Sequence, residues 1–98
     1  MVVYHIVLVK FQPGVTEETK KAWREMASQL PSQVPQIKKL EQGKKIPHPF
    51  DAGWEDGVVF HFDNEADLKA YFPHPDHQAY LKACAAILAD RICFDLEV

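Results

Sequence analysis

The chain has 98 residues, of which 47% are hydrophobic and 11% aromatic, as expected for one soluble globular domain and not for a disordered chain. Eleven basic and fourteen acidic residues give a net charge of −3, which excludes a broad basic surface for nucleic acid. A domain this small buries a limited share of its surface, so association of two copies is an expected way to cover the rest.

The two cysteines, Cys84 and Cys93, lack the paired spacing of a zinc site. We interpret both as small core residues of a protein in a reducing, cytoplasmic compartment. The apolar N-terminus, MVVYHIVLVKF, is too short to cross a bilayer and contains His5, so it predicts a strand. Neither a membrane nor a nucleic acid is an expected partner.

The first half of the chain predicts a strand, a helix and an edge strand. Residues 2–11 alternate with apolar side chains on both faces, so this strand needs cover on each side. Thr16, followed by two acidic residues, predicts a helix N-cap, and Pro31 is expected to end that helix. The helix has one apolar stripe, formed by Ala22, Trp23, Met26, Ala27 and Leu30. Residues 37–46 indicate a polar edge strand.

After a loop at 47–56, the second half predicts another strand, two helices and a last strand. Val58, Phe60 and Phe62 share one face of the third strand. Asn64, with an acid three residues later, predicts a short helix that includes Tyr71. Pro75 suits the first turn of a second helix reaching residue 88. From residue 91, alternation predicts a half-buried final strand with Ile92, Phe94, Leu96 and Val98 on one side.

The order of elements is therefore β-α-β-β-α(α)-β, which predicts a single α+β domain over residues 1–98 with the ferredoxin-like fold. Its antiparallel sheet would be covered by helices on one face. The other face has no cover within the chain, so we expect two copies to pack sheet against sheet as a homodimer. That face would use the first strand together with either Val58, Phe60 and Phe62 or Ile92, Phe94 and Leu96.

The stretch YFPHPDH, residues 71–77, carries the residues most suited to chemistry. Histidine exchanges protons near neutral pH, and tyrosine donates a hydrogen bond to a developing oxyanion. His74 and His77 lie three residues apart, on neighbouring positions of one helix face, and His5 of the first strand faces the same side as Val7. The structural alternative is a helix junction in which His74 caps the second helix and the other side chains complete the core.

Three imidazoles, from His5, His74 and His77, are also conceivable as zinc ligands with an open position. Spacing alone is weak support for such a site, and the sequence assigns no carboxylate to orient the ligands. We therefore expect no metal and no other cofactor.

The segments YHIVLVKF, GVVFHF and AYFPHPDHQAY resemble the stress-responsive A/B barrel domain (Dabb) family over essentially the whole chain. The resemblance implies a ferredoxin-like protomer that forms a dimeric α+β barrel. The best understood enzymes of this kind are plant polyketide cyclases of the olivetolic acid cyclase type, which need no cofactor. Many relatives are stress-induced proteins with no assigned reaction. The cyclases have a histidine just before the third strand, where this chain has Asp56 or Gly57.

The resemblance implies that His77, Tyr71 and His5 are catalytic. His77 would remove a proton α to a carbonyl, Tyr71 would hydrogen-bond the resulting oxyanion, and His5 would orient or polarise the substrate. Residues expected to bind the substrate are His74, Val7 and Phe60. The expected function is that of a lyase or cyclase acting on a hydrophobic, carbonyl-rich, polyketide-like molecule. The alternative is a non-enzymatic stress-response or ligand-binding homodimer.

Overall fold

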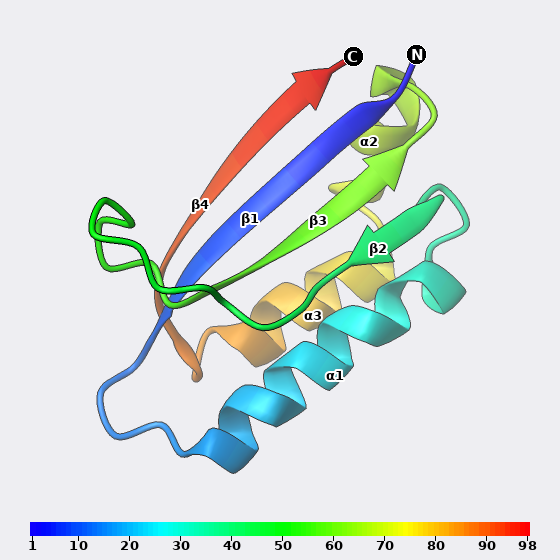
Figure 1. Ribbon diagram of the computed structural model, residues 1–98. Helices are drawn as coiled ribbons and strands as arrows, with labels where there is room; N and C mark the ends of the chain where they lie inside the picture. The colour runs from blue at the N-terminus through cyan, green and yellow to red at the C-terminus, as the bar shows by residue number, and fades with distance from the viewer.

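A computed structural model describes residues 1–98 and contains one four-stranded antiparallel sheet and three helices. In chain order the elements are β1 (Val3–Phe11), α1 (Glu17–Gln33), β2 (Lys39–Glu41), β3 (Asp56–Phe62), α2 (Glu65–Tyr71), α3 (Pro75–Cys84) and β4 (Leu88–Glu97). The strand order is β2-β3-β1-β4, and the helices lie on one face of the sheet (Figure 1). The predicted ferredoxin-like α+β fold is confirmed.

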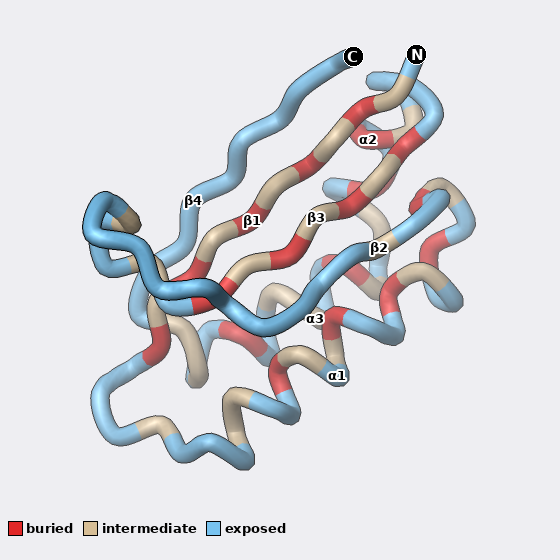
Figure 2. Tube along the Cα trace, viewed as in Figure 1, coloured by how far each residue is buried: buried red, intermediate tan, exposed pale blue.

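The core lies between the helices and the sheet face that they cover. Buried and half-buried residues alternate along β1 and β3 (Figure 2). On β3, Val58, Phe60 and Phe62 are at most 2% exposed, and Trp23 of α1 is fully buried against them and β1. Burying one large apolar side chain contributes about 1.5–3 kcal/mol, so this alternation holds the helices to one face of the sheet.

Helix α1 continues through Pro31 to Gln33, so the expected end at Pro31 was wrong. A proline removes one backbone N–H from the helix ladder, and here the loss falls in the last turn. Val34 is the C-cap, and its N–H donates to the Leu30 carbonyl at 2.8 Å and closes the helix. At the other end Thr16 is the N-cap, as predicted.

The bounds of β2 and β3 also differ from those expected. Strand β2 covers only Lys39–Glu41 instead of 37–46, because the chain then leaves β3 for a loop that an ion pair between Lys45 and Asp51 closes. Strand β3 begins two residues earlier than expected, at Asp56.

Helix α3 ends at Cys84, not at residue 88. The Ile87 N–H donates to the Cys84 carbonyl at 2.9 Å, which makes a tight turn, and β4 already begins at Leu88. Cys84 is buried as predicted. Cys93 is exposed, so its assignment to the core was wrong: β4 is an edge strand, and its residues after Leu88 are exposed. Both thiols are free.

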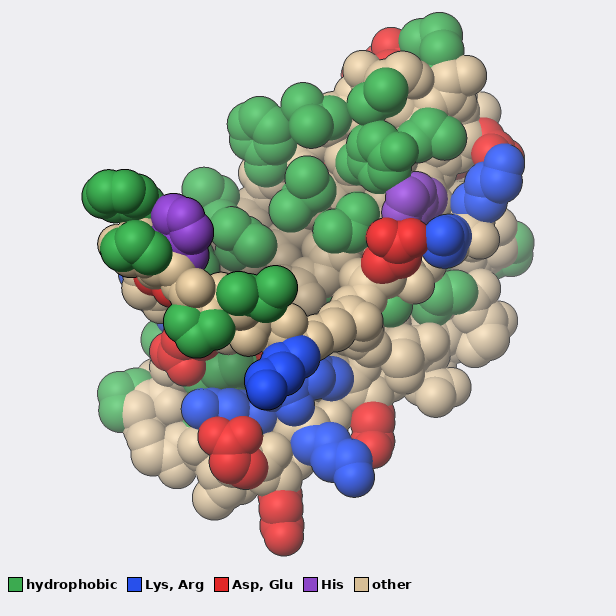
Figure 3. Space-filling model, viewed as in Figure 1, with side chains coloured by type: hydrophobic (Ala, Val, Ile, Leu, Met, Phe, Trp, Pro, Cys, Tyr) green, Lys and Arg blue, Asp and Glu red, His purple; other side chains and the backbone are tan.

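The second face of the sheet, which we call the open face, has no cover within the chain. Phe94 of β4 is 59% exposed there, and Ile92 and Leu96 beside it are 47% and 43% exposed. Across to β1, Ile92 pairs with Leu8, Phe94 with Ile6 and Leu96 with Tyr4. Figure 3 looks onto this face and shows apolar side chains across it. Of the two strand sets considered for this face, the set on β4 is therefore the one that occupies it.

No helix has both the length and the apolar character needed to cross a lipid bilayer.

Candidate active site

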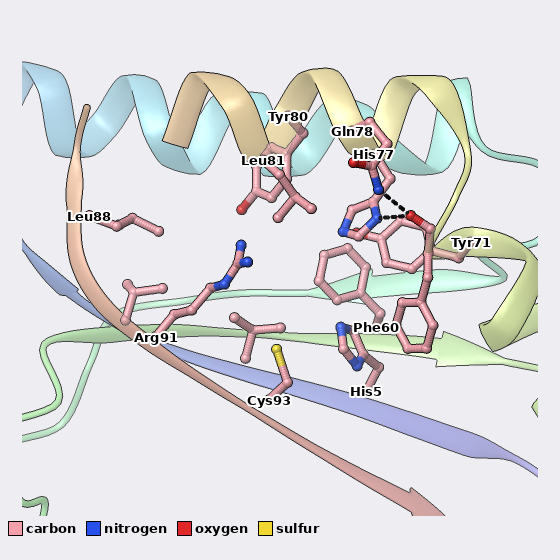
Figure 4. Close-up of a pocket in the computed structure, with 13 residues that line it drawn as sticks. His5, Phe60, Tyr71, His77, Gln78, Tyr80, Leu81, Leu88, Arg91 and Cys93 are labelled. Atoms are coloured by element: carbon pink, nitrogen blue, oxygen red, sulfur yellow. Dashed lines mark hydrogen bonds between the residues drawn. The ribbon is translucent and has the colours of Figure 1, made fainter. Parts of the chain in front are cut away.

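A cavity of about 270 Å³ lies between the helix-covered face of the sheet and α3 (Figure 4). Most of its lining is hydrophobic. Five of the six residues predicted to form a site line this cavity: His5, Val7, Phe60, Tyr71 and His77. They come from β1, β3, α2 and α3, so the fold brings together residues that are up to 72 positions apart in the sequence (5 to 77).

His77 lies in the first turn of α3 and is 8% exposed. Its Nδ1 is 2.9 Å from the Phe72 carbonyl oxygen, which also accepts a hydrogen bond from Gln78 (Figure 4). A carbonyl oxygen can only accept, so Nδ1 carries the proton of the neutral ring. The lone pair is therefore on Nε2, which makes this nitrogen the one able to accept a proton.

Burial lowers the pKa of His77 below its usual value of 6.5, because the charged imidazolium loses hydration. The hydrogen bond to the Phe72 carbonyl opposes this shift but is the weaker effect, and the nearby His5 and Arg91 lower the pKa further. His77 is thus held mainly neutral near pH 7, the state in which it can act as a base.

Tyr71 is the last residue of α2 and is 1% exposed. Its ring lies against that of His77, with centroids 3.9 Å apart and planes inclined by 33°. Burial raises the pKa of Tyr71 above its usual value of 10, so the phenol stays protonated. A protonated phenol is a hydrogen-bond donor, and it stands directly beside the candidate base.

His5 contacts the side chain of Asp95, a residue of β4 that sequence reasoning did not select. The contact joins His5 Nδ1 to the carboxylate of Asp95, and the two residues pair across β1 and β4. His5 is 4% exposed in its side chain, whereas Asp95 is 38% exposed. A carboxylate on one ring nitrogen fixes the tautomer and the orientation of an imidazole. Asp95 is therefore a positioning residue for His5.

Aromatic rings surround the His5 imidazole. The centroids of Phe60, Phe72 and Tyr71 are 5.6, 5.9 and 6.0 Å from its own. These contacts hold the ring at the edge of the cavity and keep its surroundings apolar.

His74 is the sixth predicted residue, and it does not line the cavity. It is the N-cap of α3, where its Nδ1 accepts a hydrogen bond from the Asp76 N–H at 3.1 Å. The capping role considered from the sequence is thus the one that the geometry displays. The chain has no group of three or more His, Cys, Asp or Glu side chains arranged to hold a metal ion.

Three residues of β4 that the sequence did not point to also line the cavity: Leu88, Arg91 and Cys93. Arg91 and Cys93 alternate along β4 in step with Asp95, so they lie on the same side of the strand, which faces the helices. Asp56, which stands near the position of the additional histidine in the polyketide cyclases, lies outside the cavity. Its carboxylate is 2.7 Å from Nε of Arg24.

Fold and cavity together define a ferredoxin-like α+β protein with a mainly apolar cavity between its sheet and α3. The sequence matches the profile of the stress-responsive A/B barrel domain over residues 3–98, and the chain belongs to that family. The resemblance seen in the sequence is confirmed. A comparison with curated proteins gave no significant match.

Solved structures share this fold over nearly the whole chain. A dimeric protein of unknown function from Bacteroides fragilis is 34% identical, with a TM-score of 0.79, and the match covers 99% of this chain and 96% of that one. A dimeric ferredoxin-like protein from Thermobifida fusca is 32% identical, with a TM-score of 0.80 and coverages of 100% and 92%. The hydroxynitrile lyase of Passiflora edulis is 16% identical, with a TM-score of 0.89 and coverages of 99% and 93%, which shows the fold alone.

Proposed function

We propose that the protein is a homodimer whose cavity catalyses cofactor-independent proton transfer on a hydrophobic, carbonyl-rich small molecule, as a lyase or a polyketide cyclase does. The observation that carries this proposal is the state of His77. Its Nδ1–H is committed to a backbone carbonyl, burial keeps the ring neutral, and the Tyr71 phenol lies beside it in an apolar cavity.

In the proposed reaction, Nε2 of His77 takes a proton from the carbon next to a carbonyl group. The electron pair of the broken C–H bond moves to the carbonyl oxygen, where Tyr71 donates a hydrogen bond to the developing negative charge. The enolate carbon then attacks a second carbonyl of the same molecule, and the proton held by His77 returns to the new alkoxide. His5, oriented by Asp95, polarises or positions the substrate.

The apolar walls contribute by folding the substrate. An intramolecular condensation requires the two reacting carbons to be held close together, and orientation alone accounts for much of the barrier in such reactions. Phe60 and Val7 supply part of this surface. The hydroxynitrile lyase of Passiflora edulis is an example of a lyase that has this fold.

The dimer is proposed from the open face. Its apolar residues, exposed on β4 and half-buried on β1, form a row that is unusual for a monomer, and sheet-to-sheet packing would bury it. The relatives from Bacteroides fragilis and Thermobifida fusca, which are described as dimeric, support this arrangement. The two free thiols suit a reducing cytoplasm, which we propose as the location.

The second candidate is a non-enzymatic homodimer that binds a small ligand in the same cavity. The close packing of Tyr71 and His77 favours it, because a helix junction stabilised by stacked rings needs no catalytic purpose. The two functions share the cavity and differ in whether His77 accepts a proton from the ligand.

Proton abstraction can be tested without the natural substrate. Proton NMR would follow deuterium uptake from D₂O into a panel of alkyl ketones and 1,3-diketones, with wild type, His77→Gln and Tyr71→Phe. We expect wild type to accelerate exchange above the buffer rate for some members and His77→Gln to lose this acceleration. Equal acceleration by wild type and His77→Gln would favour the ligand-binding function, as would binding of a ketone without any acceleration of exchange.

A further inference from the structure

Arg91 is the only residue lining the cavity whose side chain is charged at every physiological pH. It extends from β4 into the cavity, toward Tyr80 and Leu81 of α3 (Figure 4). The other arginine of the chain, Arg24, is paired with Asp56, whereas Arg91 takes part in no ion pair. A guanidinium thus meets a mainly apolar cavity without a carboxylate to balance it.

Neither of the carboxylates closest to Arg91 along β4 pairs with its guanidinium. Asp90 accepts a hydrogen bond from the backbone N–H of Arg91 at 2.8 Å, and Asp95 contacts His5. Arg91 itself is exposed to solvent, so water hydrates it in the free protein and an incoming anion can reach it. A ligand that brings one negative charge would provide the missing partner.

We propose that the cavity selects apolar small molecules that carry a single carboxylate, which pairs with Arg91 while the rest of the molecule extends toward Tyr71 and His77. This inference rests on the proposed function for the site and adds the anionic group of the substrate or ligand. The planar guanidinium presents two parallel N–H donors, which match the two oxygens of a carboxylate.

A phosphate group fits the same surroundings less well. A phosphate monoester carries a charge of about −1.5 to −2 at pH 7, and Arg91 supplies one positive charge. The two cavity histidines do not make up the difference: burial lowers the pKa of His77, and His5 is already engaged with Asp95. A carboxylate leaves no charge uncompensated in the apolar cavity.

The test is a set of NMR titrations with matched probes. The probes are hexanoate, octanoate, decanoate and 4-propylbenzoate, each beside its primary amide, with 4-propylphenyl phosphate as the phosphate probe. In wild type we expect at least one carboxylate to bind about tenfold more tightly than its amide. Arg91→Met should abolish this preference and leave the amide's affinity nearly unchanged. Lys82→Met, which removes an exposed cation from α3, should keep the preference.

The inference is overturned if none of the probes binds, or if no carboxylate binds more tightly than its amide. It is also overturned if the preference for a carboxylate survives in Arg91→Met, or if the phosphate binds more tightly than 4-propylbenzoate. His77→Gln separates this inference from the proposed function, because it should keep the carboxylate preference. A preference that depends on Arg91, found with no deuterium exchange, would contradict the catalysis alone. Exchange into neutral ketones without any carboxylate preference would contradict this inference alone.

Discussion

The imidazole of His77 lies against the phenol ring of Tyr71, at a centroid distance of 3.9 Å. The two residues belong to different helices, α2 and α3, and a three-residue junction separates them. That junction also supplies the Phe72 carbonyl that fixes the His77 tautomer. A hydrogen-bond donor and a neutral base therefore share one wall of the cavity.

Tyr71→Phe should separate catalysis from stability. The Tyr71 hydroxyl makes no hydrogen bond within the chain, so its removal should change the free energy of unfolding by less than about 0.5 kcal/mol. Loss of an oxyanion donor should lower the exchange rate about 10²–10³-fold. Urea unfolding and the deuterium exchange assay measure the two effects, with Tyr4→Phe on the open face as the matched control. A stability loss of about 1–3 kcal/mol would instead indicate that the phenol is a structural element of the helix junction.

Asp95→Asn should impair His5 without disturbing the fold. The amide keeps the shape of the side chain but no longer provides a carboxylate to His5 Nδ1. We expect activity to fall about 10-fold or more. The ¹⁵N shifts of the His5 ring should also move, which a merely structural role would not require. Glu97→Gln removes the same charge from the same strand and should leave both readouts as in wild type. Unchanged His5 shifts in Asp95→Asn would contradict the positioning role.

Phe94→Glu should produce a monomer. Phe94 is 59% exposed on the open face, and a charge there would be desolvated by sheet-to-sheet packing. Sedimentation velocity should show a dimer for wild type and for Ala83→Glu, which adds the same charge to an exposed position of α3. The urea midpoint of wild type should also rise with protein concentration. A Phe94→Glu dimer as stable as wild type would exclude the open face as the interface.

The unfolding free energy should decrease as the pH falls below 6.5, partly through His77. Because burial lowers the His77 pKa in the folded protein, the unfolded chain binds the proton more tightly. This contribution to stability is fully present above pH 6.5 and is lost as the pH falls through the folded-state pKa. Urea unfolding across this window should give a shallower decrease for His77→Gln and His77→Asn alike. Parallel curves for wild type and both variants would contradict the assignment.

Local sequence patterns sufficed for the parts of the site that depend on one element. Alternation along residues 2–11 placed His5 and Val7 on one face, and the cap and proline signals located the junction that carries Tyr71 and His77. Their contact depends on how two helices meet, and no local pattern encodes that distance.

The partnership of His5 with Asp95 was beyond such reasoning. The two residues are 90 positions apart, and only the register of β1 against β4 makes them neighbours. Arg91 was overlooked for a related reason. Its position in the alternating last strand indicated that its side chain lies on the polar face of that strand. This face borders the cavity because β4 lies beside β1 at the edge of the sheet.

The error at Pro31 shows that a proline in the last turn of a helix costs too little free energy to end the helix earlier.

The measurement that tests the central claim most directly is a ¹⁵N NMR titration of the His77 ring in the wild-type protein. We expect a neutral ring protonated on Nδ1 at pH 7, with a titration midpoint below 6.5. That result would place an unprotonated Nε2 in the cavity, ready to accept a proton. A ring protonated on Nε2, or a midpoint above 6.5, would contradict the assignment of His77 as the base.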